Sequence, residues 1–466
     1  MTLPPDFDEP ALGGIQRLDQ ALDRGQARVF RVLWFMAPSG SVARNVQFQQ
    51  LLASRFLTDI ALQALLYGAL IASARARGSA IDAAMLGTAY LLPGVVLGMF
   101  GGVVADAVPK RAALASAYLT MGMLSLAIPL WLGTEFRSLL LILFAVRVLH
   151  QVSQPSEASA VPLVATDDEL ASATSFLSFA SSVGEVLGKA LLAPLVVRAF
   201  GVTPVTVLAG LLFLLSATRV FDLRPRRRCP RPAEAGVEVR ISTRDAVRWL
   251  LGERTQLWMV LLAALASTIS VILGVLAPLY ARDVLNVPPA NALYVFAPAV
   301  LGLLAALMLA PLAIRVLRER AVAVIGFAIV AATMSALGFG DRLRERLPWF
   351  PVIDLPLVGE RVELAAELSI FLGLGMTLAA TATQTYISRT VPLSIQGRTF
   401  ALLGTMKDGL AIPSLLALGA LAGVVGVRWV LTIAPLLLLV LALGVDRLAG
   451  RWRTPEVPAS ADTTED

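Results

Sequence analysis

The sequence predicts an all-α membrane protein with twelve transmembrane helices in two pseudo-symmetric bundles of six. Three observations carry this prediction. Of the 466 residues, 57% are hydrophobic and only 15% are charged, whereas soluble domains carry about 25% charge. The apolar residues gather in runs of about 20, the length that crosses a bilayer as a helix, and no short alternating segments point to an outer-membrane barrel. The longest polar break predicted to be cytoplasmic follows the sixth run, as in transporters built from repeats.

Charged or turn residues bound each expected helix. The twelve helices cover residues 47–73, 83–105, 112–132, 137–163, 170–197, 201–221, 256–281, 290–314, 321–339, 363–388, 399–422 and 427–449. The resulting divisions are an N-terminal segment (1–46), a first bundle (47–221), a linker (222–255), a second bundle (256–449) and a tail (450–466). Apolar residues at helical spacing predict an interfacial amphipathic helix over 11–35 and another amphipathic helix over 242–254.

The distribution of Lys and Arg predicts the orientation. With both termini in the cytoplasm, most of the bases fall in cytoplasmic segments, including the basic linker sequence RPRRRCPRP. The N-terminus MTLPPDFDEP is acidic and carries no basic start before an apolar core, so no cleaved signal peptide is expected. The sequence therefore predicts a multi-pass protein of the cell (cytoplasmic) membrane, in contact with membrane lipid.

The composition also narrows the classes of function. The chain has one histidine and one cysteine, so neither a metal site nor a cofactor is expected. No basic surface with interleaved aromatic residues favours nucleic acid. The sequence has no HExxH, phosphate-binding loop or nucleophile motif, so an enzyme and an ATP-driven pump are both disfavoured.

One segment combines membrane and charge features more tightly than any other. The run GVVADAVPKR begins at Gly102, places Asp106 at the end of the second apolar stretch, and closes with Lys110 and Arg111. It resembles the G-x-x-x-D-(R/K)-x-G-R-(R/K) loop of the major facilitator superfamily, although Ala107 and Pro109 depart from that pattern. The resemblance implies a transporter of the major facilitator fold.

Two further stretches resemble the macrolide and multidrug efflux branch of that superfamily. PSEASAVPLVATDDELASAT covers the connection between the fourth and fifth helices, from Pro155 to Thr174. VPLSIQGRTFA contains Gly397 and Arg398 in an expected turn before the eleventh helix. The second-helix pattern around Tyr90 is also shared by the related lysophospholipid transporters. The resemblance covers both halves of the chain.

The charges of the first motif suggest a conformational latch. Asp106 near a helix end can attract the positive N-terminal dipole of a helix in the other half. Lys110 and Arg111 can meet acids or lipid phosphates at the same surface. Such a contact would favour the outward-open state, while a solvated helix end is the alternative.

Of the charged or titratable residues within the expected spans, we single out nine, because such a group inside a membrane needs a partner, water or a function. They are Arg55, Asp59, Arg147, His150, Glu157, Glu185, Lys189, Lys407 and Asp408. We take this set as the candidates for transport and proton coupling, with static ion pairs as the alternative. Arg55 and Asp59 share a helix face, and Glu185 precedes Lys189 by four residues, the favourable order for an ion pair.

Depth in the bilayer predicts one pair between helices. Asp59 and Arg147 each lie about ten residues from a membrane boundary, so both are expected near the midplane and paired, with His150 one turn away. A carboxylate whose cation moves away in one conformation takes up a proton more readily. This is the physical basis of proton-coupled antiport.

Lys189 departs from the family. It stands where related exporters carry a Gly-Pro kink in the fifth helix, and it would suit an anionic or zwitterionic cargo unless Glu185 neutralises it. The leading function is a secondary transporter that exports an amphiphilic small molecule against protons, or Na⁺ as the alternative ion, as a monomer. The alternatives are a lysophospholipid transporter and a transport-inactive scaffold or receptor.

Overall fold

In a computed structural model the described part of the chain is almost entirely helical. The structure describes residues 42, 45–107, 109–165, 169–221, 254–339, 360–390 and 393–450. The two expected amphipathic helices, the linker over 222–253 and the tail from 451 onward lie outside these residues.

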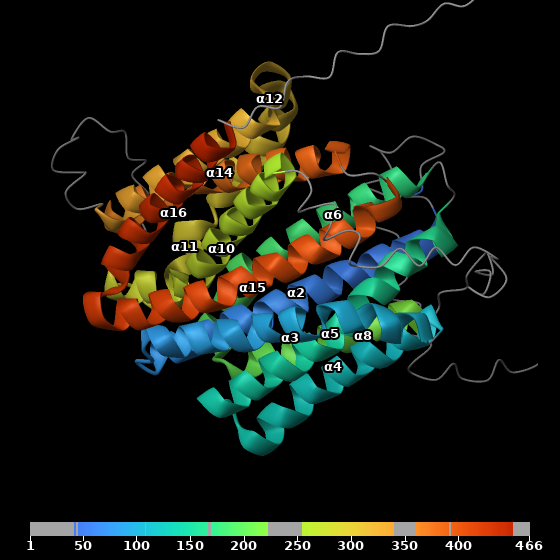
Figure 1. Ribbon diagram of the computed structural model, residues 1–466. Helices are drawn as coiled ribbons and strands as arrows, with labels where there is room; N and C mark the ends of the chain where they lie inside the picture. The colour runs from blue at the N-terminus through green and yellow to red at the C-terminus, as the bar shows by residue number, and fades with distance from the viewer. Residues whose placement is uncertain are drawn as a thin grey trace, which may run out of the picture.

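The first half of the chain forms one group of packed helices (Figure 1). Its elements are α2 (Val46–Arg75), α3 (Ala80–Ala107), α4 (Lys110–Leu132), α5 (Phe136–Val164), α6 (Leu170–Val186), η3 (Leu187–Leu192), α7 (Ala193–Phe200) and α8 (Thr203–Phe221). The helix ends follow from local chemistry, because Gly133 and Gly201 adopt positive φ angles directly after α4 and α7, where glycine carries no steric penalty. At the other end of the group, Asn45 caps α2 and donates to the carbonyl of Val164 at 2.6 Å.

The second half forms another group of helices (Figure 1). Its elements are α10 (Arg254–Asp283), η4 (Pro289–Asn291), α11 (Ala292–Phe296), α12 (Ala299–Gly338), α14 (Glu360–Thr390), α15 (Leu393–Val425) and α16 (Val427–Gly450). Within the described residues ten helices are long and apolar enough to cross a bilayer, and Val427–Leu437 is a shorter apolar helix.

The 40-residue helix α12 contains two spans. Its backbone leaves helical geometry at Arg318. Gly302 packs against Ile370, while Gly326 packs against Gly375 of the same helix α14. A continuous straight helix would hold Gly302 and Gly326 roughly 36 Å apart, so the chain folds back at Arg318. With η3 joining α6 and α7 into one span, the expected twelve-span order is present.

The two groups touch along one end of the molecule. Gly419 on α15 packs against Ala84 on α3, and Gly87 on α3 packs against Leu415 on α15. We call this end, which holds residues 76–79 and 284–291, the closed end. Small residues let the helix backbones approach closely there, which is the usual basis of helix packing in a bilayer.

Candidate functional site

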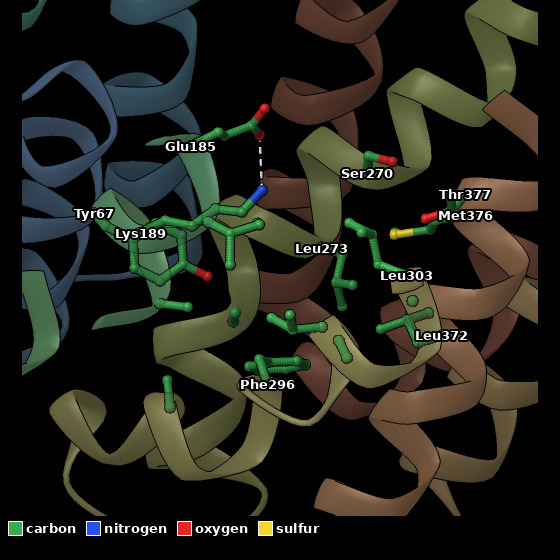
Figure 2. Close-up of a pocket in the computed structure, with 18 residues that line it drawn as sticks. Tyr67, Glu185, Lys189, Ser270, Leu273, Phe296, Leu303, Leu372, Met376 and Thr377 are labelled. Atoms are coloured by element: carbon green, nitrogen blue, oxygen red, sulfur yellow. Dashed lines mark hydrogen bonds and ion pairs between the residues drawn. The ribbon is translucent and has the colours of Figure 1, made fainter. Parts of the chain in front are cut away.

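A cavity of about 230 Å³ lies between the two groups of helices (Figure 2). The first half supplies Tyr67 from α2 and the α6–η3 residues Glu185, Val186, Lys189 and Ala190. The second half supplies a mostly apolar wall. That wall consists of Ser270, Leu273, Gly274, Ala277, Ala292, Phe296, Ala299, Val300, Leu303, Leu372, Gly373, Met376 and Thr377.

One ion pair supplies the charge of the cavity wall among its described residues. Lys189 Nζ donates to Glu185 Oε1 at 2.7 Å, and the two side chains are 35% and 47% exposed. The pair predicted from the four-residue spacing is therefore present. Figure 2 shows it across the cavity from Ser270 and Met376.

The helix that carries this pair changes its winding at the cavity. Residues Leu187–Leu192 form a π-helix, an arrangement frequent at functional sites. Lys189 lies inside it, one residue after Gly188. A Cβ atom on Gly188 would lie 2.5 Å from the carbonyl oxygen of Ile60, so glycine is required for α2 to pack against the π-helix. At the position where related exporters are expected to have a Gly-Pro kink, this chain therefore has a π-helical segment.

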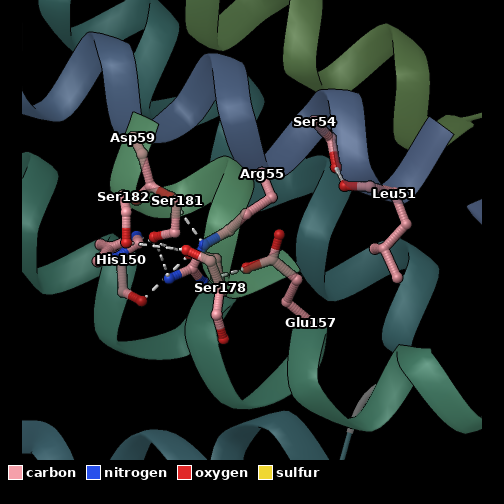
Figure 3. Close-up of polar contacts among 10 residues, drawn as sticks. Leu51, Ser54, Arg55, Asp59, His150, Glu157, Ser178, Ser181 and Ser182 are labelled. Atoms are coloured by element: carbon pink, nitrogen blue, oxygen red, sulfur yellow. Dashed lines mark hydrogen bonds and ion pairs between the residues drawn. The ribbon is translucent and has the colours of Figure 1, made fainter. Parts of the chain in front are cut away.

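A second charged cluster is buried in the first half (Figure 3). Arg55 Nε donates to Asp59 Oδ2 at 2.8 Å, and another nitrogen of Arg55 donates to Glu157 Oε2 at 2.6 Å. A third contact runs from Arg55 to the Ser181 hydroxyl at 3.2 Å. Asp59 and Glu157 are 8% and 3% exposed. The single guanidinium of Arg55 therefore forms ion pairs with two buried carboxylates.

The predicted Asp59–Arg147 pair is wrong. Asp59 is bound by Arg55 one turn away on its own helix. The guanidinium carbon of Arg147 instead lies 4.7 Å from the centre of the Tyr90 ring, a cation–π contact. Depth in the bilayer set the level of both residues but not the direction in which each side chain leaves its helix.

His150 lies one turn from Arg147 as expected and is buried. Its Nδ1 is 3.2 Å from the hydroxyl of Ser153, which also donates to the His150 carbonyl. His150 is therefore held by its own helix.

Asp408, which follows Lys407 on α15 of the second half, lies against the first half. A Cβ on Gly94 of α3 would lie 2.3 Å from Asp408 Oδ2 and 3.4 Å from Gln151 Nε2. The carboxylate thus lies directly against the α3 backbone.

The two sequence motifs at the other end of the molecule are described only in part. Gly102 and Asp106 lie in the last turns of α3, and Lys110 begins α4 after Pro109. Arg111 is exposed, while the burial of Gly102 and the side chain of Asp106 lie outside what the structure describes. Gly397 and Arg398 are helical, because α15 already begins at Leu393. The turn expected at these two residues is therefore a helical segment.

The sequence offered little warning of the contact at the closed end. Arg282 near the end of α10 donates to the carbonyls of Ala74 at 2.9 Å and Gly78 at 3.0 Å, both in the first half. Asp283 accepts two further bonds from the same guanidinium. The signal in the sequence was a charged pair at the end of the seventh apolar run. Tyr67 and the second-half wall of the cavity carried no charge that could mark them.

Comparisons with known proteins agree with this architecture. The family model described as Major Facilitator Superfamily matches residues 51–406. No curated protein sequence matches the chain.

Solved transporters share the fold at low sequence identity. The nucleoside transporter NupG (D323A mutant) is 12% identical with a TM-score of 0.68, over 86% of this chain and 99% of that one. A D-xylose-proton symporter is 14% identical with a TM-score of 0.65, over 86% and 97%. A bacterial homolog of the human lysosomal transporter Spinster, inward-facing and unoccupied, is 15% identical with a TM-score of 0.66, over 88% and 98%.

The family model covers most of the chain, and the twelve-span order and the cavity between two helix groups agree with it. The chain therefore belongs to the Major Facilitator Superfamily.

Proposed function

We propose that the chain is a secondary transporter that works by alternating access and exports an amphiphilic small molecule in exchange for protons. The observation that carries the proposal is the cavity between the two helix groups, which has an apolar wall on one side and the Glu185–Lys189 pair on the other. Such a site suits a cargo with an apolar body and a polar head.

The proposed orientation places both termini in the cytoplasm of the cell. The closed end then lies at the outer surface, because α2 runs from the cytoplasm to residues 76–79. In this orientation Arg282 and the packing of Gly87 and Gly419 close the outer side. The described conformation would be inward-facing, and the partner state would require these contacts to separate.

The Arg55 cluster is the proposed proton-coupling site. Two carboxylates, Asp59 and Glu157, share one guanidinium, which leaves one surplus negative charge in a buried place. Adding one proton makes the cluster neutral, which favours protonation where water is excluded. Gly184 on α6 packs against Asp59 of the cluster. The next residue on α6 is Glu185, so this helix connects the cluster to the ion pair of the cavity.

A lysophospholipid is the second candidate cargo. Its zwitterionic head could pair with both Glu185 and Lys189, so that each charge at the cavity would keep a counter-charge when the cargo is bound. A singly charged cargo satisfies only one of them. The apolar second-half wall could hold the single acyl chain.

Transport in proteoliposomes tests the proposal. The purified full-length protein is reconstituted, an inward or outward pH gradient is imposed, and flux is followed for ethidium, as a lipophilic cation, and for a fluorescent single-chain phosphocholine. Gradient-driven flux of either probe with matching proton flux supports the proposal, and its preference for one probe separates the two cargo classes. A protein that moves neither probe nor protons would be better described as a scaffold or receptor.

A further inference from the structure

The two halves face each other along two lines, which we call seams: α3 faces α15 at the first seam, and η3 faces α12 at the second. The two seams differ in how closely the halves pack. At the first seam, α3 packs along α15 from Ala84 and Gly419 to Gly94 and Asp408. This contact extends from the closed end to the level of the charged residues. The two halves are therefore in direct contact along this stretch.

At the second seam, the contacts between the halves among the described residues lie near the closed end. There η3 contacts α11 and α7 contacts η4, while neither α6 nor η3 packs along α12 in the described residues. Yet η3 and α12 are opposite walls of the cavity, through Ala190 on one side and Leu303 on the other. The cavity is therefore lined by both elements, although their backbones do not pack against each other in the described residues.

Both rims of this seam carry exposed apolar side chains. On the first rim Leu195 is 54% exposed, and on the second rim Leu301 is 61% and Met308 is 80% exposed. Leu191 and Leu304, next to the cavity residues Ala190 and Leu303, are also exposed. In a membrane these side chains contact acyl chains, so the apolar lining of the cavity would continue directly into lipid.

We propose that the seam between η3 and α12 is a lateral portal, through which a bilayer-dissolved amphiphile reaches the cavity without crossing water. This inference rests on the proposed transport function and adds the route and the physical form of the cargo. The apolar body would pass between Ala190 and Leu303, while the charged head turns inward to the Glu185–Lys189 pair. Moving an acyl chain from the bilayer into water exposes each of its methylenes at a cost in free energy, and the lateral route avoids that cost.

The first test uses fluorescent single-chain phosphocholines of increasing chain length with the reconstituted full-length protein. The total amount of probe is fixed and the amount of lipid is varied. The lateral route requires the initial rate to follow the mole fraction of probe in the bilayer. A rate that follows the free aqueous concentration at every chain length would overturn it.

The second test narrows the portal. Ala190→Trp places a large side chain between the walls and is expected to slow the long-chain probe about tenfold. The matched control is Met85→Trp, an exposed apolar position beside the other seam, which is expected to leave the rate unchanged.

A third variant guards against misfolding of the Trp variant. Leu304→Cys in a Cys229→Ser background is reconstituted first and then modified with a membrane-soluble pyrene maleimide, so that the same vesicles are compared before and after. Slowing on modification supports the portal. Unchanged rates for both the modified cysteine and Ala190→Trp would contradict it, whereas failure of the unmodified protein to move any probe would overturn the proposed function and the portal with it.

Discussion

The guanidinium of Arg282 in the second half donates a hydrogen bond to the carbonyl of Gly78 in the first half, at 3.0 Å. The same nitrogen also donates to the Ala74 carbonyl, one residue before the end of α2. Carbonyls at a helix C-terminus carry partial negative charge and lack intrahelical partners, so a cation there is stabilising. This contact fastens the closed end without an acid from the first half.

Arg282→Gln is expected to loosen the closed end. Hydrogen bonds from a charged donor contribute about 1.5–3 kcal/mol each, so losing them shifts the balance of conformations by at least about tenfold. The measurement is the labelling rate of a cysteine at the buried position Leu415, in a Cys229→Ser background, by a membrane-impermeant maleimide. Asp283→Asn is the control because it keeps both carbonyl contacts, and equal labelling in the two variants would show that the contact does not hold the halves together.

In the Arg55 cluster, removing the carboxylate of Glu157 and removing the guanidinium of Arg55 should have different outcomes. Glu157→Gln leaves a neutral Arg55–Asp59 pair, so the protein should stay folded while pH-gradient-driven uphill transport is lost. Arg55→Leu leaves two carboxylates buried without a cation and should cost about 3–5 kcal/mol of stability. Thermal unfolding in detergent and proteoliposome flux measure the two effects. Persistent uphill transport in both Glu157→Gln and Asp59→Asn would exclude the cluster as the coupling site.

Gly188 predicts a packing effect at the π-helix. In Gly188→Ala the new methyl group would meet the backbone of Ile60 and Ala64, so the helices must separate at a cost of about 1–3 kcal/mol. In the control Gly404→Ala on α15, the added Cβ would meet open space. This substitution should be neutral or slightly stabilising, since alanine favours helix. The measurement is the unfolding temperature of each variant. Equal shifts for Gly188→Ala and Gly404→Ala would contradict the steric explanation.

The Glu185–Lys189 pair predicts a rescue by exchange. Glu185→Gln leaves Lys189 without its partner at the cavity and is expected to lower transport of a zwitterionic probe about tenfold or more. The double exchange Glu185→Lys with Lys189→Glu restores the pair and should recover stability, less a small amount for the reversed order along the helix. Flux of zwitterionic, anionic and cationic probes of equal chain length is measured for each variant. If the single variant transports all three at the original rate, the pair does not contact cargo.

Features confined to one helix followed from the sequence. The contacts Arg55–Asp59 and Glu185–Lys189 depend only on helical spacing, and both are present. The spans were also predicted from apolar length, although the structure merges the eighth and ninth across Arg318. The π-helix at Leu187–Leu192 was not predicted, because its winding depends on packing against α2.

Contacts between helices required the tertiary structure. The proposed partners Asp59 and Arg147 lie at similar depth, yet the rotation of each helix directs Arg147 to Tyr90 and Glu157 to Arg55. The sequence also did not predict three other features. These are the second-half wall of the cavity, the contact of Arg282 at the closed end and the difference between the two seams. Sequence alone determined that this is a membrane protein with a twelve-span, two-half transporter architecture, because apolar length and motif spacing are properties of a single segment. Only the tertiary structure decided which charges meet and where a cavity opens, because these depend on how separate helices rotate and pack against one another.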